Sequence, residues 1–207
     1  MGVIYTCNEG LEKLKEGNRG HIHRMETQGG RESYQIGTTE EGQEPYAAIL
    51  SCADSRVIPE CIFTANAGDL FVVRVAGNVA NVSSVASLEY AVKYLHIRII
   101  VVLGHESCGA VDSTIKQAKD RLNLGANLNQ LLSNIIPAVN TEIPTDDLVE
   151  ATCNNAEIAA KRLIEQSEIL QEYFDKGELG VVHGYYQVYG PKAGHIKGII
   201  NWKCPKC

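Results

Sequence analysis

Residues 46–56 read Tyr-Ala-Ala-Ile-Leu-Ser-Cys-Ala-Asp-Ser-Arg, an apolar run typical of a buried strand that leads directly into a thiol, a carboxylate and a guanidinium. In extended chain, residues two apart point to the same side. Cys52, Asp54 and Arg56 are therefore expected to project together from the carboxyl end of this strand. Open α/β sheets bind their ligands at that edge. The stretch predicts a parallel strand that ends in a functional site.

A second apolar strand, 99–103, leads into Gly-His-Glu-Ser-Cys-Gly at 104–109. His105 and Cys108 are three apart, a spacing that puts two side chains on one face of a helical turn. Two sulfurs, one imidazole and the Asp54 carboxylate, from two strand ends, form a ligand set that suits zinc. We predict a metal site here. Buried thiols without a metal are the alternative, because a lone cysteine at a strand end is more often a small hydrophobe.

Strands and helices alternate along the chain, which indicates an α/β fold with a mostly parallel central sheet flanked by helices. An antiparallel hairpin is expected at the C-terminal edge of the sheet. The predicted strands are 46–51, 70–75, 99–103, 178–188 and 195–202, and the longer predicted helices run from 83 to 95, 109 to 119, 127 to 139 and 146 to 174.

The length of 207 residues predicts one domain covering 1–207. A short amphipathic helix is expected at 8–18, ending near Gly17, and it is followed by a polar segment up to residue 44. We interpret residues 1–44 as an N-terminal helix and an arm that lies over another surface, with a solvated loop as the alternative. Residues 203–207 are expected to form a flexible tail.

Charge and composition exclude several classes of function. The formal net charge of −6 and the pI near 5.5 argue against a nucleic-acid partner. No apolar run approaches the roughly 20 residues that a membrane-spanning helix needs, and no secretion signal is recognised at the N-terminus. Seven cysteines, an odd number spread along the chain, favour a reducing, cytoplasmic location over a disulfide scaffold. No glycine-rich nucleotide-binding motif is present.

Four blocks of the sequence resemble the β-class carbonic anhydrases. The blocks are Cys-Ala-Asp-Ser-Arg-Val-Ile-Pro-Glu at 52–60, Gly-Asp-Leu-Phe-Val-Val-Arg-Val-Ala-Gly-Asn at 68–78, Ser-Leu-Glu-Tyr-Ala-Val at 87–92 and Val-Val-Leu-Gly-His-Glu-Ser-Cys-Gly-Ala-Val at 101–111. The resemblance is strong over roughly 40–115 and looser over 154–186. It implies one Zn²⁺ per chain held by Cys52, His105 and Cys108. It also implies a dyad of Asp54 and Arg56, in which Asp54 is a zinc ligand in a closed state only.

The resemblance further implies a narrow pocket for CO2 lined by Gln43, Phe71, Tyr90 and Gly109, often with side chains from two subunits. The implied reaction is the reversible hydration of CO2 to bicarbonate and a proton through a zinc-bound hydroxide, in a homodimer or a dimer of dimers. A carbonyl sulfide or carbon disulfide hydrolase of the same fold is one alternative. A non-catalytic zinc or thiol protein is another, because Cys204 and Cys207 form a C-x-x-C pair.

Overall fold

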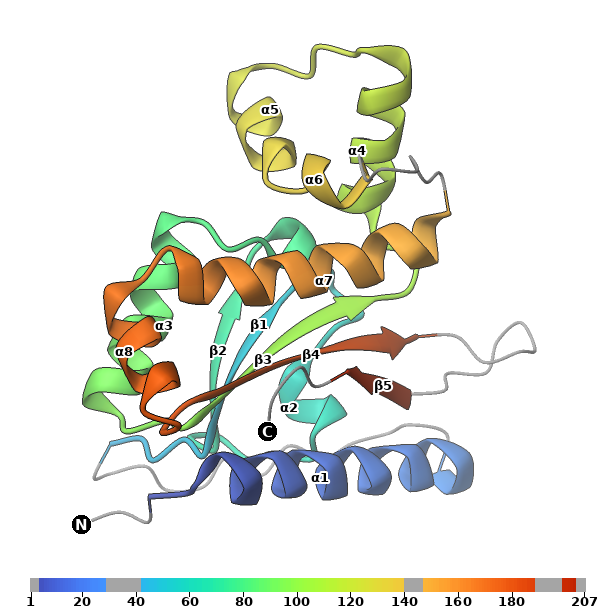
Figure 1. Cartoon of the computed structure of the whole chain (residues 1–207). Helices are drawn as coiled ribbons and strands as arrows, with labels where there is room; N and C mark the ends of the chain where they lie inside the picture. The colour runs from blue at the N-terminus through green and yellow to red at the C-terminus, as the bar shows by residue number, and fades with distance from the viewer. Residues whose placement is uncertain (1–3, 29–41, 140–146, 189–198, 204–207) are drawn as a thin grey trace.

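A five-stranded sheet forms the centre of the computed structural model, which describes residues 4–28, 42–139, 147–188 and 199–203 (Figure 1). The strand order is β2-β1-β3-β4-β5. The first four strands in this order are parallel, and they are β2 (Leu70–Arg74), β1 (Ala47–Ser51), β3 (Ile99–His105) and β4 (Gly180–Gln187). The predicted α/β fold with a parallel sheet is confirmed. β5 (Ile199–Lys203) pairs antiparallel with β4, and the segment 189–198 between them lies outside the described residues.

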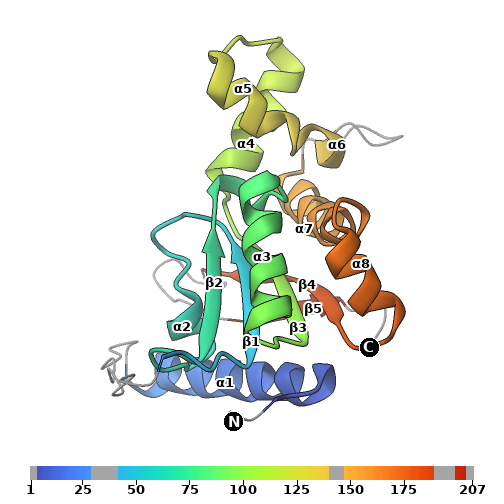
Figure 2. The same cartoon turned by 90° about the vertical axis from the view of Figure 1, so that its left-hand side faces the viewer.

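Helices cover both faces of the sheet, because alternate residues of the strands point to opposite sides. Ala48 and Leu50 belong to an apolar cluster with α3 (Val82–Tyr94), α7 (Leu148–Glu165) and α8 (Glu168–Asp175). Ala47 and Ile49 pack on the other face, in a cluster with α1 (Cys7–Gln28) and α2 (Pro59–Ile62). Figure 2 shows α3, α7 and α8 lying along the sheet and α1 running beneath it. Within the described residues, no helix combines the length and the apolarity needed to cross a bilayer.

A third group of helices stands at the carboxyl edge of the parallel strands, at the top of Figure 1. It consists of α4 (Gly109–Asp120), α5 (Ala126–Ser133) and α6 (Ile136–Val139), together with the short 3-10 helix η1 (Ala76–Asn78). A separate apolar cluster joins α4, α5 and α6 to Cys52 and Cys108. Helices therefore cover part of the edge at which the sequence predicts a site.

The N-terminal helix is longer than the predicted span 8–18, because α1 continues to Gln28. Gly17 does not end the helix as predicted, and it allows close contact instead. A Cβ atom at Gly17 would lie 1.8 Å from the Phe63 carbonyl oxygen, so only glycine lets α1 approach α2 at this point. Part of the predicted arm is thus helical, and its residues 29–41 lie outside the described part of the chain.

Two predicted long helices are each divided in the structure. The span 146–174 breaks into α7 and α8 because Ser167 starts a new helix. Its Oγ accepts a hydrogen bond from the Leu170 N–H (3.0 Å) and donates one to Glu89 Oε1 (2.6 Å). The span 127–139 breaks into α5 and α6 just before Pro137, which has no N–H with which to continue a helix.

Candidate metal centre

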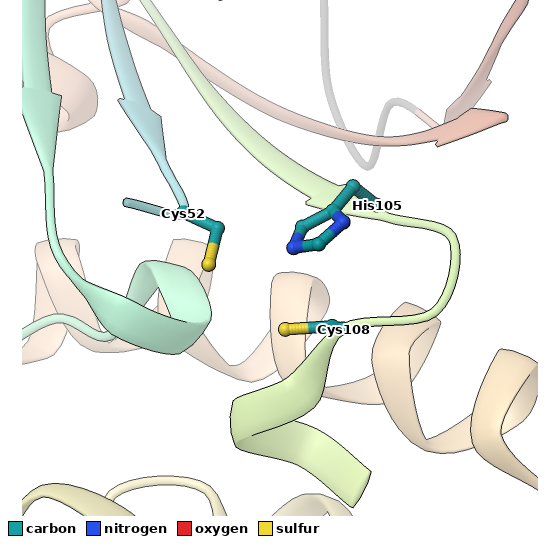
Figure 3. A group of neighbouring side chains, drawn as sticks. All are labelled: Cys52, His105 and Cys108. Atoms are coloured by element: carbon teal, nitrogen blue, oxygen red, sulfur yellow. The ribbon is translucent and has the colours of Figure 1, made fainter. Parts of the chain in front are cut away.

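Three buried side chains meet at the carboxyl edge of the sheet (Figure 3). Cys52 follows β1, His105 is the last residue of β3, and Cys108 directly precedes α4. Their ligand atoms all lie within 4.8 Å of one another. β1 and β3 are parallel neighbours, so their carboxyl ends bring together residues that are far apart in the sequence. The structure therefore unites the two sulfurs and the imidazole at one point.

The connection between His105 and Cys108 differs from the predicted helical turn. Glu106 and Ser107 form a turn between β3 and α4, and Ser107 has a positive φ of 56°. The left-handed backbone at Ser107 redirects the chain so that Cys108 faces back toward the strand. The two ligands share a side because of this turn and not because of helical spacing.

His105 presents its Nε2 atom to the two sulfurs. Its Nδ1 lies 3.0 Å from the Glu106 carbonyl oxygen, and a carbonyl can only accept, so Nδ1 carries the proton. Nε2 then has a lone pair, and it is buried with no hydrogen-bond partner among the described residues. A buried nitrogen without a partner is costly. A cation between the three side chains would satisfy it.

The pKa values of the two thiols shift in opposite directions. The neighbouring Cys108 thiol lowers the pKa of Cys52 against the opposing effect of burial, with smaller lowering contributions from His105 and from the Gly77 N–H. The same contact with Cys52, together with burial, raises the pKa of Cys108. In the metal-free site one thiolate is thus stabilised by one thiol. Binding of a cation releases the remaining proton, because thiolates and not thiols are metal ligands.

Asp54 lies beside the cluster and pairs with Arg56. Arg56 Nε donates to Asp54 Oδ1 (2.9 Å), Nη2 donates to Oδ2 (2.7 Å), and the Arg56 backbone N–H also donates to Oδ1 (2.9 Å). These bonds hold the pKa of Asp54 well below its usual range. Asp54 Oδ2 is 4.0 Å from His105 Nε2. The carboxylate is therefore close to the three ligands while both of its oxygens are held by Arg56.

Three residues that sequence patterns did not single out shape the centre. Arg74, at the end of β2, donates to the Asp54 carbonyl oxygen (2.6 Å) and to the Cys52 carbonyl oxygen (3.2 Å). The Gly77 N–H donates to Cys52 Sγ (3.2 Å), and Asn155 Nδ2 donates to the Gly77 carbonyl oxygen (2.7 Å). Arg74 ends a strand beside the predicted site, which is a signal that could have found it. Asn155 has no such signal, because it lies 78 residues from Gly77 in the sequence.

The predicted pocket residues do not all lie beside the cluster within this chain. Phe71 pairs with Ala48 in the β1–β2 register, four residues before Cys52, which is about 13 Å along a strand. Tyr90 lies next to Phe71, with ring centroids 6.3 Å apart, and Gln43 is an exposed residue before the amino end of β1. Gly109 alone is adjacent to the cluster, since it follows Cys108. The terminal pair Cys204 and Cys207 lies outside the described residues.

The donor set fits zinc. Bonds from zinc to sulfur and nitrogen are about 2.0–2.3 Å, so ligands of one ion lie within about 4.6 Å of each other. The three atoms here nearly meet that limit before any ion draws them together. Two thiolates and one neutral imidazole are borderline-soft donors, which zinc prefers, and three protein ligands leave the fourth position of a catalytic zinc site open.

Comparisons with known proteins agree with this geometry. A family model described as carbonic anhydrase matches residues 47–193. Carbonic anhydrase 2 of Mycobacterium tuberculosis is 45% identical over 98 residues, which cover 47% of this chain and 47% of that protein. The carbonic anhydrase of Synechococcus elongatus is 33% identical over 144 residues, covering 64% and 51%. The chain spans about half the length of the curated relatives it matches.

Solved structures show the same fold. The β-carbonic anhydrase CcaA has a TM-score of 0.67 and is 25% identical, with 97% of this chain and 91% of that chain covered. A β-carbonic anhydrase of Sordaria macrospora also has a TM-score of 0.67 at 20% identity, with 94% and 96% covered. Fold and cluster together define an α/β protein with a cysteine–histidine–cysteine zinc site. The chain belongs to the β-class carbonic anhydrase family.

Proposed function

We propose that this protein catalyses the reversible hydration of CO2 to bicarbonate and a proton, with one zinc ion per chain. The observation that carries the proposal is the convergence of Cys52, His105 and Cys108 beside a carboxylate that Arg56 holds away from the ligands. Membership of the carbonic anhydrase family supports the same reaction.

The three ligands would supply zinc chemistry at neutral pH. A zinc ion in such a site acidifies a coordinated water and so provides a strong nucleophile without a strong base. The ligands cancel the charge of the cation, and a fourth protein ligand would close the site. Arg56 prevents this closure by taking both oxygens of Asp54. In the closed state that we also propose, Asp54 would leave Arg56 and become the fourth ligand.

With both oxygens on Arg56, Asp54 keeps lone pairs on the side of the cluster. We propose that it accepts a hydrogen bond from the nucleophile, which orients a lone pair of the nucleophile toward the carbon of CO2. Arg56 also donates to the Ser107 carbonyl oxygen (3.2 Å), so it ties the Asp54 strand end to the turn that carries Cys108. The dyad is thus fixed relative to two of the three ligands.

The pocket for CO2 is proposed to form between two copies of the chain. Gln43, Phe71 and Tyr90 belong to the amino end of the sheet, so their own cluster is out of their reach. A second copy could bring them beside the cluster and Gly109, where Gln43 would donate a hydrogen bond to an oxygen that gains negative charge. Tyr90 is 49% exposed, which suits a residue that meets a partner. The Sordaria macrospora relatives are described as tetrameric, and we propose a homodimer or a dimer of dimers here.

Two further features are inferred on the same basis. All described strands join one sheet, so we propose that the chain folds as a single domain in which β4 and β5 form an edge hairpin. Cys52 and Cys108 are not joined in a disulfide and must stay reduced to bind a cation, so we propose a cytoplasmic location.

The test is a single thiol substitution, Cys108→Ser, with Cys61→Ser as the matched control outside the cluster. Stopped-flow CO2 hydration should fall to background in Cys108→Ser and zinc content should fall from one per chain, because serine is a poor zinc ligand. Cys61→Ser should keep both. Survival of zinc and activity in Cys108→Ser would contradict the proposal. Assays of sulfide release from carbonyl sulfide and carbon disulfide separate CO2 hydration from hydrolase activity at the same centre.

A further inference from the structure

A buried asparagine links helix α7 to the metal centre. Asn155 is 1% exposed and lies on the buried face of α7, whose other members are mostly alanines. Its Nδ2 donates to the Gly77 carbonyl oxygen at 2.7 Å. A carbonyl can only accept, so the amide orientation of Asn155 is fixed by chemistry. An apolar residue would cost less to bury at this position, which indicates that the hydrogen bond itself is what the site uses.

The partner of Asn155 is a glycine in a constrained turn. Gly77 has φ 72° and ψ 19°, a left-handed conformation that other residues rarely adopt. A Cβ atom there would lie 2.6 Å from Ile135 Cδ1 and 3.2 Å from Ala110 Cβ. The Gly77 N–H donates to Cys52 Sγ at 3.2 Å. The carbonyl held by Asn155 and the N–H that meets the sulfur therefore belong to the two peptide units on either side of one Cα atom.

We propose that Asn155 is a positioning residue for the metal ligand Cys52, an inference that rests on the zinc site of the proposed function. By holding the Gly77 carbonyl, Asn155 fixes the turn 76–78 so that the Gly77 N–H stays directed at the sulfur. An N–H bond to a thiolate withdraws electron density from it and limits its rotation. Cys52 then donates less charge to the cation and keeps its place in the ligand set.

The experiment uses two variants of the full-length, metal-loaded protein. Asn155→Asp has the same shape but cannot donate to the Gly77 carbonyl when ionised, and Asn155→Ser is too short to reach it. Asn18→Asp is the matched control, because Asn18 is also a buried asparagine whose Nδ2 donates to a backbone carbonyl (Ile62, 3.2 Å) but lies far from the centre on α1. Each protein is loaded with zinc for metal release and with Co²⁺ for spectroscopy.

Both Asn155 variants should release zinc to a chelator about 10–100-fold faster than the unmodified protein, the usual effect of losing a group that supports a metal ligand. Their thiolate-to-cobalt absorption should move to longer wavelength, because a sulfur without its N–H bond is easier to oxidise. Asn18→Asp should change neither property. Unchanged release and absorption in both Asn155 variants would overturn the proposal, as would equal acceleration in the Asn18→Asp control.

If neither Asn155 variant folds, the unmodified protein still decides the matter. After loading with ¹¹³Cd, the Gly77 amide proton should show a scalar coupling to the metal through the N–H···S bond, and absence of this coupling would overturn the proposal. These readouts do not depend on CO2 hydration. Altered metal release in the Asn155 variants, together with no hydration activity in the unmodified protein, would reject the proposed function alone. Normal activity in the unmodified protein, together with unaltered metal release in the Asn155 variants, would reject the role of Asn155 alone.

Discussion

At the scale of single residues, the fate of the Asp54 carboxylate decides whether the proposed site is open. Arg56 occupies both oxygens, and Oδ2 is only 4.0 Å from His105 Nε2. We propose that a rotation of the Asp54 side chain would exchange Arg56 for the metal as a partner. Nothing else among the described residues takes both oxygens of this carboxylate.

Removal of the guanidinium should close the centre. We expect Arg56→Ala to keep its zinc but to lose about 10²–10⁴-fold in CO2 hydration, because Asp54 is then drawn to the cation and is lost as a hydrogen-bond acceptor. The hydration rate of Arg56→Lys should lie between those of Arg56→Ala and the unmodified protein, since lysine keeps the charge but not the paired N–H donors. Zinc analysis and stopped-flow rates on the same samples check this. A wild-type rate in Arg56→Ala would show that the dyad is not needed.

The ion pair also predicts a direction for stability against pH. Arg56 lowers the pKa of Asp54, so the pair stabilises the fold fully above the ordinary carboxyl pKa of about 3.9 and less as the pH falls below it. In urea unfolding, the metal-free unmodified protein should have a higher free energy of unfolding than Asp54→Asn. This difference should be constant from pH 6 to 8 and should shrink below about pH 4. An advantage that grows on acidification would contradict the pairing. Rate changes between pH 6 and 9 should not come from protonation of Asp54.

The ligands could be predicted from the sequence and the residues behind them could not. Cys52, His105 and Cys108 follow directly from two apolar runs, and the geometry of parallel strands brings such ends together. Asn155 meets Gly77 only through the packing of α7 over the strand ends. Its place in the sequence, inside an amphipathic helix, is indistinguishable from that of any helical asparagine. Tertiary packing, which local patterns do not contain, determines this part of the site.

At the scale of elements, the contact between α1 and α2 depends on one glycine. Gly17→Ala would place a methyl group 1.8 Å from the Phe63 carbonyl oxygen, a backbone atom that cannot move aside cheaply. We expect a loss of about 1–3 kcal/mol in the free energy of unfolding. Gly20→Ala on the same helix meets its nearest atom at 3.4 Å and should be neutral or gain about 0.5–1 kcal/mol from helix propensity. Urea denaturation at one protein concentration compares them, and equal effects would contradict the packing role.

Gly17 also explains why the predicted end of α1 is wrong. A glycine inside a helical pattern is commonly read as a helix end, and that reading shortened α1 to residue 18. Its real role is visible only with the opposing carbonyl in place. Ser167 is the converse case. It caps the start of a new helix, but it lies inside a long amphipathic pattern that is predicted as one continuous helix. The four parallel strands lie where the sequence predicts them, since buried parallel strands are continuous apolar runs that need no partner information.

At the scale of the whole molecule, the two groups of residues that make up the proposed site lie at opposite ends of the sheet. The ligands gather at the carboxyl end, and Gln43, Phe71 and Tyr90 at the amino end. In an isologous dimer each site would take its ligands from one subunit and its pocket from the other. Mixing two inactive variants tests whether each site takes residues from both subunits.

Two inactive variants should restore each other if the site is shared. We expect Gln43→Ala to lose about 10²–10³-fold in hydration and Cys108→Ser to be inactive. After joint unfolding and reassembly with zinc, random pairing makes half of the dimers mixed, and each mixed dimer has one intact site, so about a quarter of the wild-type activity should return. If Gln43 served the ligands of its own chain, no mixed dimer would hold an intact site. Activity no greater than that of the separate variants would therefore place the pocket within one chain, and a return near one quarter is possible only when the two halves come from different subunits.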